Sequence, residues 1–257
     1  MPDPSTGSGH RELVHYAVSD AVATITLDSQ HNRNALSQQL VTELVERLER
    51  ANTDDDVKVV LVRQEGKVFC SGADLSEATT VGMEEGARRI VALQRLIAGM
   101  DKPVVTRVQG AVRAGGIGIV AASDIAISAH DATYALTEVK LGLAAAIISL
   151  TVHARMNPRA AALTTLGGEV FTGSQAAEYG LVTRAVTPAD LDGAVDAVCG
   201  QLATGAAQGL RESKRILNAD LVRRIDALGD DMAALSARLF ASDEAREAMT
   251  AFLNRKR

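Results

Sequence analysis

Short strand-like runs alternate with helical patterns along the first 187 residues, and this alternation constrains the fold most. The runs at 57–64 and 103–110 are rich in valine, whereas apolar residues recur at helical spacing in 36–48 and 83–99. Strands joined by helices in this order predict an α/β fold with crossover connections. After about residue 187 the strand patterns stop and only amphipathic helical patterns follow.

The chain is expected to have three parts. Residues 1–12 are rich in proline, serine and glycine, which predicts a flexible N-terminal tail. Residues 13–190 form the expected mixed core, which starts with a hairpin that turns at Ser19-Asp20. Residues 191–257 form a helical region, whose last helix is expected to begin at Ser242, with acidic residues in its first turn.

Charge and composition exclude several classes of protein. The 27 basic and 32 acidic residues give a net charge of −5, which offers no support for a nucleic-acid or anionic-membrane partner. Aromatic residues make up 3% of the chain, too few to favour a base-stacking platform. Two cysteines, Cys70 and Cys199, are too few for a disulfide framework or a zinc site. Without an apolar stretch near the roughly 18 residues of a membrane helix, a cytoplasmic protein with no membrane or metal partner is expected.

One glycine-rich motif fits a dinucleotide-binding fingerprint. Gly116, Gly118 and Ala121 match the pattern G-x-G-x-x-A, and Glu138 follows Gly118 by 20 residues. The match is weak because it occurs in the middle of the chain, after more than a hundred residues of α/β pattern. The alternative is that these glycines let a helix begin close to a neighbouring backbone.

Two turns of small residues indicate a different chemistry. One is the segment FCSGADL (69–75), and the other is Gly115-Gly116; each is followed by a helical pattern. Such turns bring backbone N–H groups close to a ligand, and two of them aimed at one oxygen make an oxyanion hole.

Six motifs together resemble the enoyl-CoA hydratase/isomerase (crotonase) superfamily, from about residue 13 to the C-terminus. They are NRNAL (32–36), FCSGADL (69–75), DKPVV (101–105), AGGIGIVAASDIAI (114–127), YALTEVKLGL (134–143) and FTGSQAAEYGLV (171–182). The resemblance implies a crotonase-like (ClpP/crotonase) spiral of β-β-α units with a C-terminal helical region. It also implies a homotrimer or a dimer of trimers, assembled through apolar positions such as Leu235, Leu239 and Phe252.

The resemblance also implies the residues of an acyl-CoA site. The N–H groups of Ala73 and Gly115 match the two donors to the thioester oxygen. The other positions that match substrate- or coenzyme A-binding residues are Arg33, Ala35, Ser71, Asp74, Leu75, Gly118, Phe252 and Arg255. The last two match positions offered by a neighbouring subunit; alternatively they are a core aromatic and a helix-terminal cation.

The catalytic carboxylates decide which reaction the resemblance implies. Family hydratases usually carry two glutamates; here the first position is Gly118 and only Glu138 remains, at an expected strand end. The implied function is hydration of a 2-enoyl-CoA by one glutamate, with no cofactor beyond the coenzyme A of the substrate. Hydratases of the 3-methylglutaconyl-CoA type share this glycine. The alternatives are an enoyl-CoA isomerase, a non-catalytic acyl-CoA-binding member and a dinucleotide-dependent oxidoreductase.

The glycine at position 118 suggests a hypothesis about the acyl group. Without a side chain there, room would remain beside the acyl pocket for a bulky or anionic tail, and Arg113 could attract an acidic one. The alternative is that this enzyme never needed the second carboxylate.

Overall fold

Four β-β-α repeats build the core of the computed structural model, which describes residues 11–74, 77 and 82–254. The first two repeats are β1 (Val14–Ser19), β2 (Val22–Leu27), α1 (Gln38–Thr53), β3 (Val59–Gln64), β4 (Val68–Cys70) and α2 (Met83–Gly99). The next two are β5 (Val104–Val108), β6 (Ala111–Arg113), α3 (Gly115–Ala122), β7 (Ile125–Ala129), β8 (Thr133–Ala135) and α4 (Ala146–Arg155). The expected spiral of β-β-α units is therefore confirmed.

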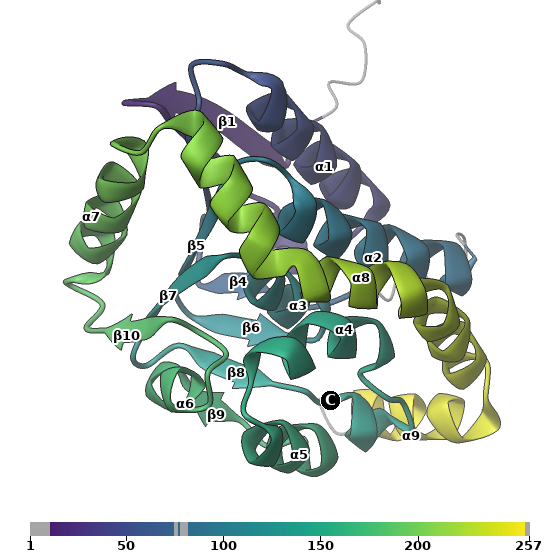
Figure 1. The fold of residues 1–257 in the computed structure, drawn as a ribbon. Helices are drawn as coiled ribbons and strands as arrows, with labels where there is room; N and C mark the ends of the chain where they lie inside the picture. Colours follow the sequence, from purple (N-terminus) through teal and green to yellow (C-terminus); the bar gives the residue numbers. More distant parts are fainter. Residues whose placement is uncertain (1–10, 75–76, 78–81, 255–257) are drawn as a thin grey trace, which may run out of the picture.

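The repeats distribute their strands over two sheets (Figure 1). One sheet has the order β1-β2-β3-β5-β7-β10 and the other β4-β6-β8-β9. From the second repeat onward, the first strand of each repeat joins the larger sheet and the second strand joins the smaller one. Neighbouring strands from successive repeats pair in parallel, as crossover connections require.

The remaining elements include two short 3-10 helices and the C-terminal helices. Their bounds are η1 (Gln30–Asn32), η2 (Glu138–Leu141), α5 (Pro158–Gly167), β9 (Phe171–Thr172), α6 (Gly173–Glu178), β10 (Arg184–Val186), α7 (Leu191–Ala203), α8 (Ala207–Phe240) and α9 (Asp243–Asn254). After β10 the described chain is helical, as expected. The Oγ of Ser242 accepts a hydrogen bond from the Ala245 N–H at 3.2 Å, which confirms the expected start of the last helix.

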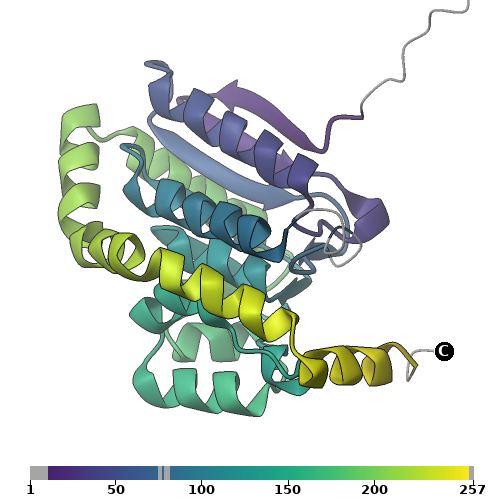
Figure 2. The same ribbon diagram turned by 90° about the vertical axis from the view of Figure 1, so that its right-hand side faces the viewer.

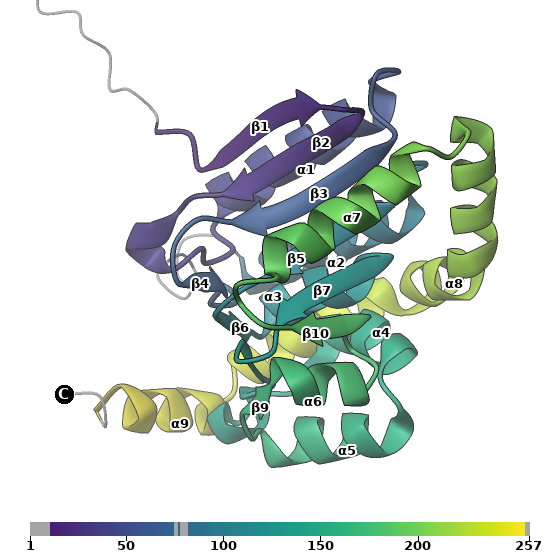
Figure 3. The same ribbon diagram turned by 90° about the vertical axis from the view of Figure 1, so that its left-hand side faces the viewer.

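The C-terminal helices cover the core. Helix α7 packs against β3, β5 and β7, and Figure 3 shows it in front of the larger sheet with α1 and α2 behind. Helix α8 packs along α2 and α4 (Figures 1 and 2), while α9 runs outward from its end. These helices complete the burial of the core.

A buried ion pair fastens α8 to the core. The Nζ of Lys214 donates hydrogen bonds of 2.8 Å to the carbonyls of Ile97 and Lys102, and it lies 2.9 Å from the Oδ2 of Asp124. The Lys214 side chain is only 4% exposed. Burial lowers the pKa of Lys214, but its three partners compensate the buried ammonium group.

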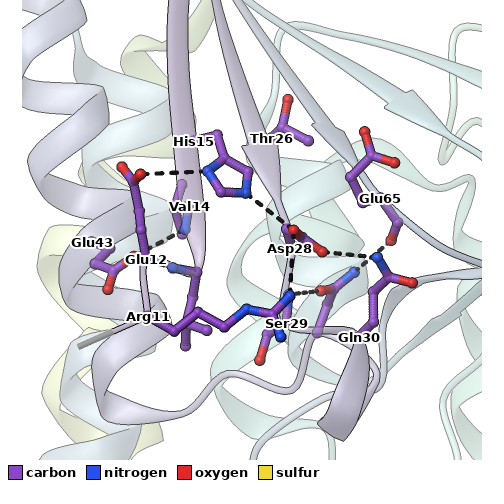
Figure 4. Close-up of polar contacts among 12 residues, drawn as sticks. Arg11, Glu12, Val14, His15, Thr26, Asp28, Ser29, Gln30, Glu43 and Glu65 are labelled. Atoms are coloured by element: carbon purple, nitrogen blue, oxygen red, sulfur yellow. Dashed lines mark hydrogen bonds and ion pairs between the residues drawn. The ribbon is translucent and has the colours of Figure 1, made fainter. Parts of the chain in front are cut away.

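The β1–β2 hairpin begins the larger sheet and carries an exposed polar cluster. Its turn residues, Asp20 and Ala21, both have positive φ, as a two-residue hairpin turn requires. The predicted hairpin is therefore confirmed, but its turn lies one residue later than the expected Ser19-Asp20, because Ser19 still pairs with Val22. In Figure 4, His15 lies between Glu12 and Asp28, with its Nε2 3.1 Å from the Oδ2 of Asp28. These hydrogen bonds raise the pKa of His15.

The described residues hold no group of three or more His, Cys, Asp and Glu side chains arranged to bind a metal ion. Within the same residues, no helix is both long and apolar enough to span a membrane.

Candidate functional site

Three predicted site residues follow the carboxyl ends of three neighbouring parallel strands. In the smaller sheet, Cys70 of β4 pairs with Val112 of β6, and the end of β6 pairs with the end of β8. Ala73, Gly115 and Glu138 each follow within three residues of these strand ends. Adjacent strands are about 4.8 Å apart, so the sheet gathers the three residues at one edge.

The N–H group of Ala73 points away from the segment that pairs with it. The Leu36 N–H donates a 2.8 Å hydrogen bond to the carbonyl of Gly72. In a planar trans peptide the C=O and the following N–H point in opposite directions, so the Ala73 N–H faces away from Leu36. Ala73 is exposed, which leaves this donor accessible to a ligand.

The N–H group of Gly115 begins helix α3. The first N–H groups of a helix have no acceptor within it, and the helix dipole makes this end positive. The preceding residue, Ala114, has φ 44° and ψ −120°, a conformation that an L-residue rarely adopts. Such strain at the start of a helix is typical of functional sites.

Glycines allow the two small-residue turns to touch. A Cβ on Gly72 would lie 2.9 Å from the Cβ of Ala114, and one on Gly116 would lie 2.6 Å from the Cβ of Cys70. The Cys70 thiol is buried, and burial raises its pKa to about 12. The thiol therefore fills space between the turns and is not a nucleophile.

The loop that contains Arg33 and Ala35 lies beside the Ala73 turn. The Ser71 N–H donates to the carbonyl of Arg33 at 3.1 Å, and the Nδ2 of Asn32 donates to the Oδ2 of Asp74 at 3.0 Å. The structure therefore brings together the predicted residues Arg33, Ala35, Ser71, Ala73, Asp74 and Gly115.

Three predicted positions are not placed beside this group. Leu75 and Arg255 lie outside the described residues. Phe252 belongs to α9, but its side chain also lies outside what the structure describes.

Glu138 begins the 3-10 helix η2, so the expectation that it stands at a strand end is wrong. Strand β8 ends at Ala135, three residues before Glu138. Thr137 has φ −85° and ψ 0°, in the bridge region of the Ramachandran plot, so the backbone is no longer extended there. The Oε2 of Glu138 is buried and has no hydrogen-bond partner among the described residues. Burial raises the pKa of Glu138 to about 7, in the range that suits proton transfer near neutral pH.

An apolar pocket of about 90 Å³ lies next to Ala73. Its walls include Leu36, Val41, Ala73, Met83, Ala87, Ile90, Ile147 and Phe240. A Cβ on Gly115 would touch Leu36 and Ile90, so these two wall residues also flank the second predicted donor. Glu138 is not part of the wall. The pocket therefore suits an apolar group that extends from an atom held at Ala73 and Gly115.

The expected room beside Gly118 is absent. A Cβ there would lie 2.8 Å from the Cγ2 of Ile148 and 3.0 Å from the Oε1 of Gln94, because α2 and α4 close over α3. Arg113 does not attract an acidic tail either. Its Nη1 donates to the carbonyl of Thr133 at 2.7 Å, so it links β6 to β8, and it is not in the pocket wall.

The dinucleotide fingerprint does not have the topology that its function needs. A dinucleotide-binding βαβ unit has both strands in one sheet. Here β6, before the glycines, is in the smaller sheet, whereas β7, after α3, is in the larger one. The glycines instead allow the close approach of α3 to Cys70 and to α2 and α4.

Two buried polar residues near the site have roles that the sequence did not indicate. Asn34 has φ 52° and donates through Nδ2 to the carbonyl of Val68 at 2.8 Å, which fixes the Arg33 loop against β4. Gln94 lies beside Gly118 with 0% exposure. A polar residue on the apolar face of the 83–99 helical pattern was the available signal for Gln94.

The raised pKa of Glu138 predicts how stability changes with pH. An unfolded glutamate titrates near 4.5 and the folded one near 7, so the folded state binds more protons between these values. The contribution of Glu138 to stability is therefore highest below the lower value and falls as pH rises to about 7, by on the order of 3 kcal/mol at most. Glu138→Gln removes this loss. The difference between the Tm of the variant and the Tm of wild type should therefore increase as the pH is raised from 4.5 to 8. Glu178→Gln, at an exposed carboxyl in α6, is the control and should show a constant difference.

Comparison with known proteins identifies relatives that match most of the chain. The chain is 44% identical to an enoyl-CoA hydratase from Mycobacterium avium of known structure, with a TM-score of 0.90 over 96% of this chain and 98% of that one. It is 30% identical to a Bacillus subtilis protein named "Probable enoyl-CoA hydratase", over 95% of this chain and 96% of the other. It is also 28% identical to the 1,2-epoxyphenylacetyl-CoA isomerase of Escherichia coli, over 95% of this chain and 97% of the relative. The family model described as enoyl-CoA hydratase/isomerase matches residues 17–257, and the chain belongs to that family.

Proposed function

We propose that the protein is an enoyl-CoA hydratase, which adds water to a 2-enoyl-CoA thioester to give a 3-hydroxyacyl-CoA. The observation that carries this proposal is that Ala73, Gly115 and Glu138 follow the carboxyl ends of three adjacent parallel strands of the smaller sheet, and that the Glu138 Oε2 is buried. The M. avium relative, which is named as a hydratase, supports it.

The proposed mechanism uses a single carboxylate. The thioester oxygen accepts hydrogen bonds from the N–H groups of Ala73 and Gly115. As the Glu138 carboxylate takes a proton from water, the water oxygen bonds to C3 and the π electrons move into the thioester as an enolate. The two N–H groups stabilise the enolate, and Glu138 returns the proton to C2. One C–O and one C–H bond form, and the carboxylate is regenerated.

The loop of Arg33 and Ala35, with Ser71 and Asp74, would hold the coenzyme A part of the substrate, and no further cofactor takes part. The roles of Leu75, Gly118, Phe252 and Arg255 stay predictions. The pocket wall is mostly apolar but also contains the charged residues Asp74, Glu77 and Arg89, so it does not discriminate between an uncharged acyl group and the carboxylated group of the 3-methylglutaconyl-CoA branch. A cytoplasmic location also stays a prediction.

An isomerase is the second candidate, because a lone carboxyl suffices to move a proton between C2 and C4. Incubation with a panel of 2-enoyl- and 3-enoyl-CoA thioesters, followed by mass spectrometry, separates the two reactions. Hydration adds the mass of one water, whereas isomerisation leaves the mass unchanged and alters the absorbance of the conjugated enoyl group. Tight binding without any product would contradict both and indicate a non-catalytic acyl-CoA-binding protein.

Gly115→Pro tests the oxyanion hole because proline removes the N–H group. Proline is favoured at the first position of a helix, where the N–H has no helical partner. We expect kcat to fall about a hundred- to a thousandfold, the usual effect of losing one such donor. Gly115→Ala is the matched control, since it adds the same Cβ against Leu36 and keeps the N–H. A folded proline variant as active as the alanine variant would remove Gly115 from the mechanism.

A homotrimer or dimer of trimers is also proposed. Helix α8 exposes large apolar side chains, as expected, but these are Ile216, Leu217 and Leu228, whereas Leu235 and Leu239 are half-buried. The large apolar side chains that are exposed around η2 and α5 are Val139, Leu163, Leu166 and Val170. Light scattering on wild type and Leu166→Lys tests whether this surface joins subunits; an unchanged mass would exclude Leu166 from the interface.

A further inference from the structure

Gln94 occupies the space that a side chain at position 118 would need. Its Oε1 is 3.0 Å from the Cβ position of Gly118, and the Cγ2 of Ile148 is 2.8 Å from the same point. A larger residue at 118 would displace one of these groups. The buried amide of Gln94 thus packs against Gly118, in the space that a larger residue at position 118 would fill.

The amide of Gln94 is bonded on both sides. Its Nε2 donates to the carbonyl of Ile90 at 3.3 Å and to the carbonyl of Ile147 at 3.2 Å. Its Oε1 accepts a 2.7 Å hydrogen bond from the Oγ1 of Thr151. A fully bonded, buried amide restricts the groups around it to one arrangement. Gln94 therefore fixes the first two turns of α4 against α2.

Both carbonyls that Gln94 binds belong to residues of the pocket wall. Ile90 contributes from α2 and Ile147 from α4, and they enclose the apolar pocket beside Ala73. The bond to Ile90 stays within α2, four residues back, so the NH₂ group ties α2 to α4 through its bond to Ile147, and Thr151 adds a second link from α4 to the Oε1.

We propose that Gln94 is a positioning residue that sets the width of the acyl pocket and so determines which acyl chains the enzyme accepts. The inference rests on the proposed function, because it takes the pocket as the site of the acyl group. Gln94 does not touch the reacting atoms, so its effect acts through Ile147 and Ile90. It should therefore alter KM for different acyl chains more than kcat.

The experiment compares a short and a medium chain in wild type and Gln94→Met. Methionine keeps the length of the side chain and loses its donors and acceptor. One methylene in an apolar pocket is worth roughly 10- to 200-fold in specificity. We expect the ratio of kcat/KM for 2-decenoyl-CoA to that for crotonyl-CoA to change by about tenfold or more, mainly through KM. The kcat for the better substrate should stay within a few-fold of wild type.

Two threonine variants separate positioning from a general loss of stability. Thr151→Val removes only the donor to Oε1 and should move the ratio in the same direction by a smaller factor. Thr164→Val removes a buried hydroxyl that donates to Ala160 in α5, outside the pocket wall, and should leave the ratio unchanged. Thermal melts establish that each variant folds. If Gln94→Met does not fold, the kcat/KM ratio of Thr151→Val is used to test the inference.

Binding of non-reactive thioesters distinguishes failure of this inference from failure of the proposed function. Calorimetry gives Kd for butyryl-CoA and octanoyl-CoA with each variant. If wild type hydrates no enoyl-CoA but binds both, the ratio of the two Kd values still tests Gln94. A ratio within twofold of wild type in folded Gln94→Met and Thr151→Val overturns the inference. If wild type binds neither thioester, both proposals are wrong.

Discussion

Glu138→Gln is expected to lower kcat/KM for a 2-enoyl-CoA by about a hundred- to ten-thousandfold, the usual contribution of a general acid–base group. The carboxyl oxygen Oε2 is buried and has no hydrogen-bond partner within the part of the chain that the structure describes. The pKa of about 7 leaves the group able to accept and return a proton near neutral pH. Glutamine has the same shape but carries no titratable proton. Affinity for a saturated acyl-CoA should stay within a few-fold of wild type.

The pH profile gives an independent check on Glu138. Wild-type kcat/KM should rise with pH through an apparent pKa near 7, because the ionised carboxylate is the base that activates water. Glu178→Gln, in α6, should keep both the rate and this profile. Turnover by Glu138→Gln within a few-fold of wild type would show that another group transfers the proton.

Lys214→Met is expected to destabilise the protein by about 3–5 kcal/mol, the usual cost of removing one partner of a buried ion pair. Asp124 would keep a buried charge without its cation, and the carbonyls of Ile97 and Lys102 would lose their donor. For a domain of this size, the loss corresponds to a fall in Tm on the order of 10 °C. Thermal and urea unfolding measure it.

Two further variants identify the origin of that effect. Lys214→Met combined with Asp124→Asn removes the unpaired charge and should recover part of the stability. Arg211→Met changes a half-buried cation on the same helix, whose side chain is 37% exposed and pairs with the neighbouring Glu212, and it should cost well under 1 kcal/mol. Equal losses for Lys214→Met and Arg211→Met would mean that the ion pair does not anchor α8.

The sequence predicts the longer elements of the fold well. The helix expected at 83–99 is α2, with the same bounds, and the runs 57–64 and 103–110 contain β3 and β5. These segments are long enough for their apolar spacing to show a period. Strands β4 and β6 were missed, since three residues are too few to show any alternation. The sequence pattern indicates a turn over residues 69–75, and only the family resemblance implies the smaller sheet.

The candidate site was predictable where it depends on local backbone. Gly115 and the small residues around Ala73 signal turns in the sequence itself. The space beside Gly118 was not predictable, because Gln94 and Ile148 reach it from helices that lie far away in the chain. The helical start at Glu138 was missed for a related reason: η2 packs against α5 and α9, which follow it in sequence. Tertiary packing, rather than local preference, determines these features.

The placement of the site on three successive strands of the smaller sheet bears on how such an enzyme could be redesigned. Each strand ends in its own loop, and in the proposed mechanism each loop supplies one group: the Ala73 N–H from the first, the Gly115 N–H from the second and the Glu138 carboxyl from the third. The pairing of the strands, rather than contacts between the loops, fixes the relative positions of these three groups. One loop could therefore be replaced without changing the other two. Replacing the loop after β8 would change the proposed proton-transfer group and leave the two proposed N–H donors to the thioester oxygen in place.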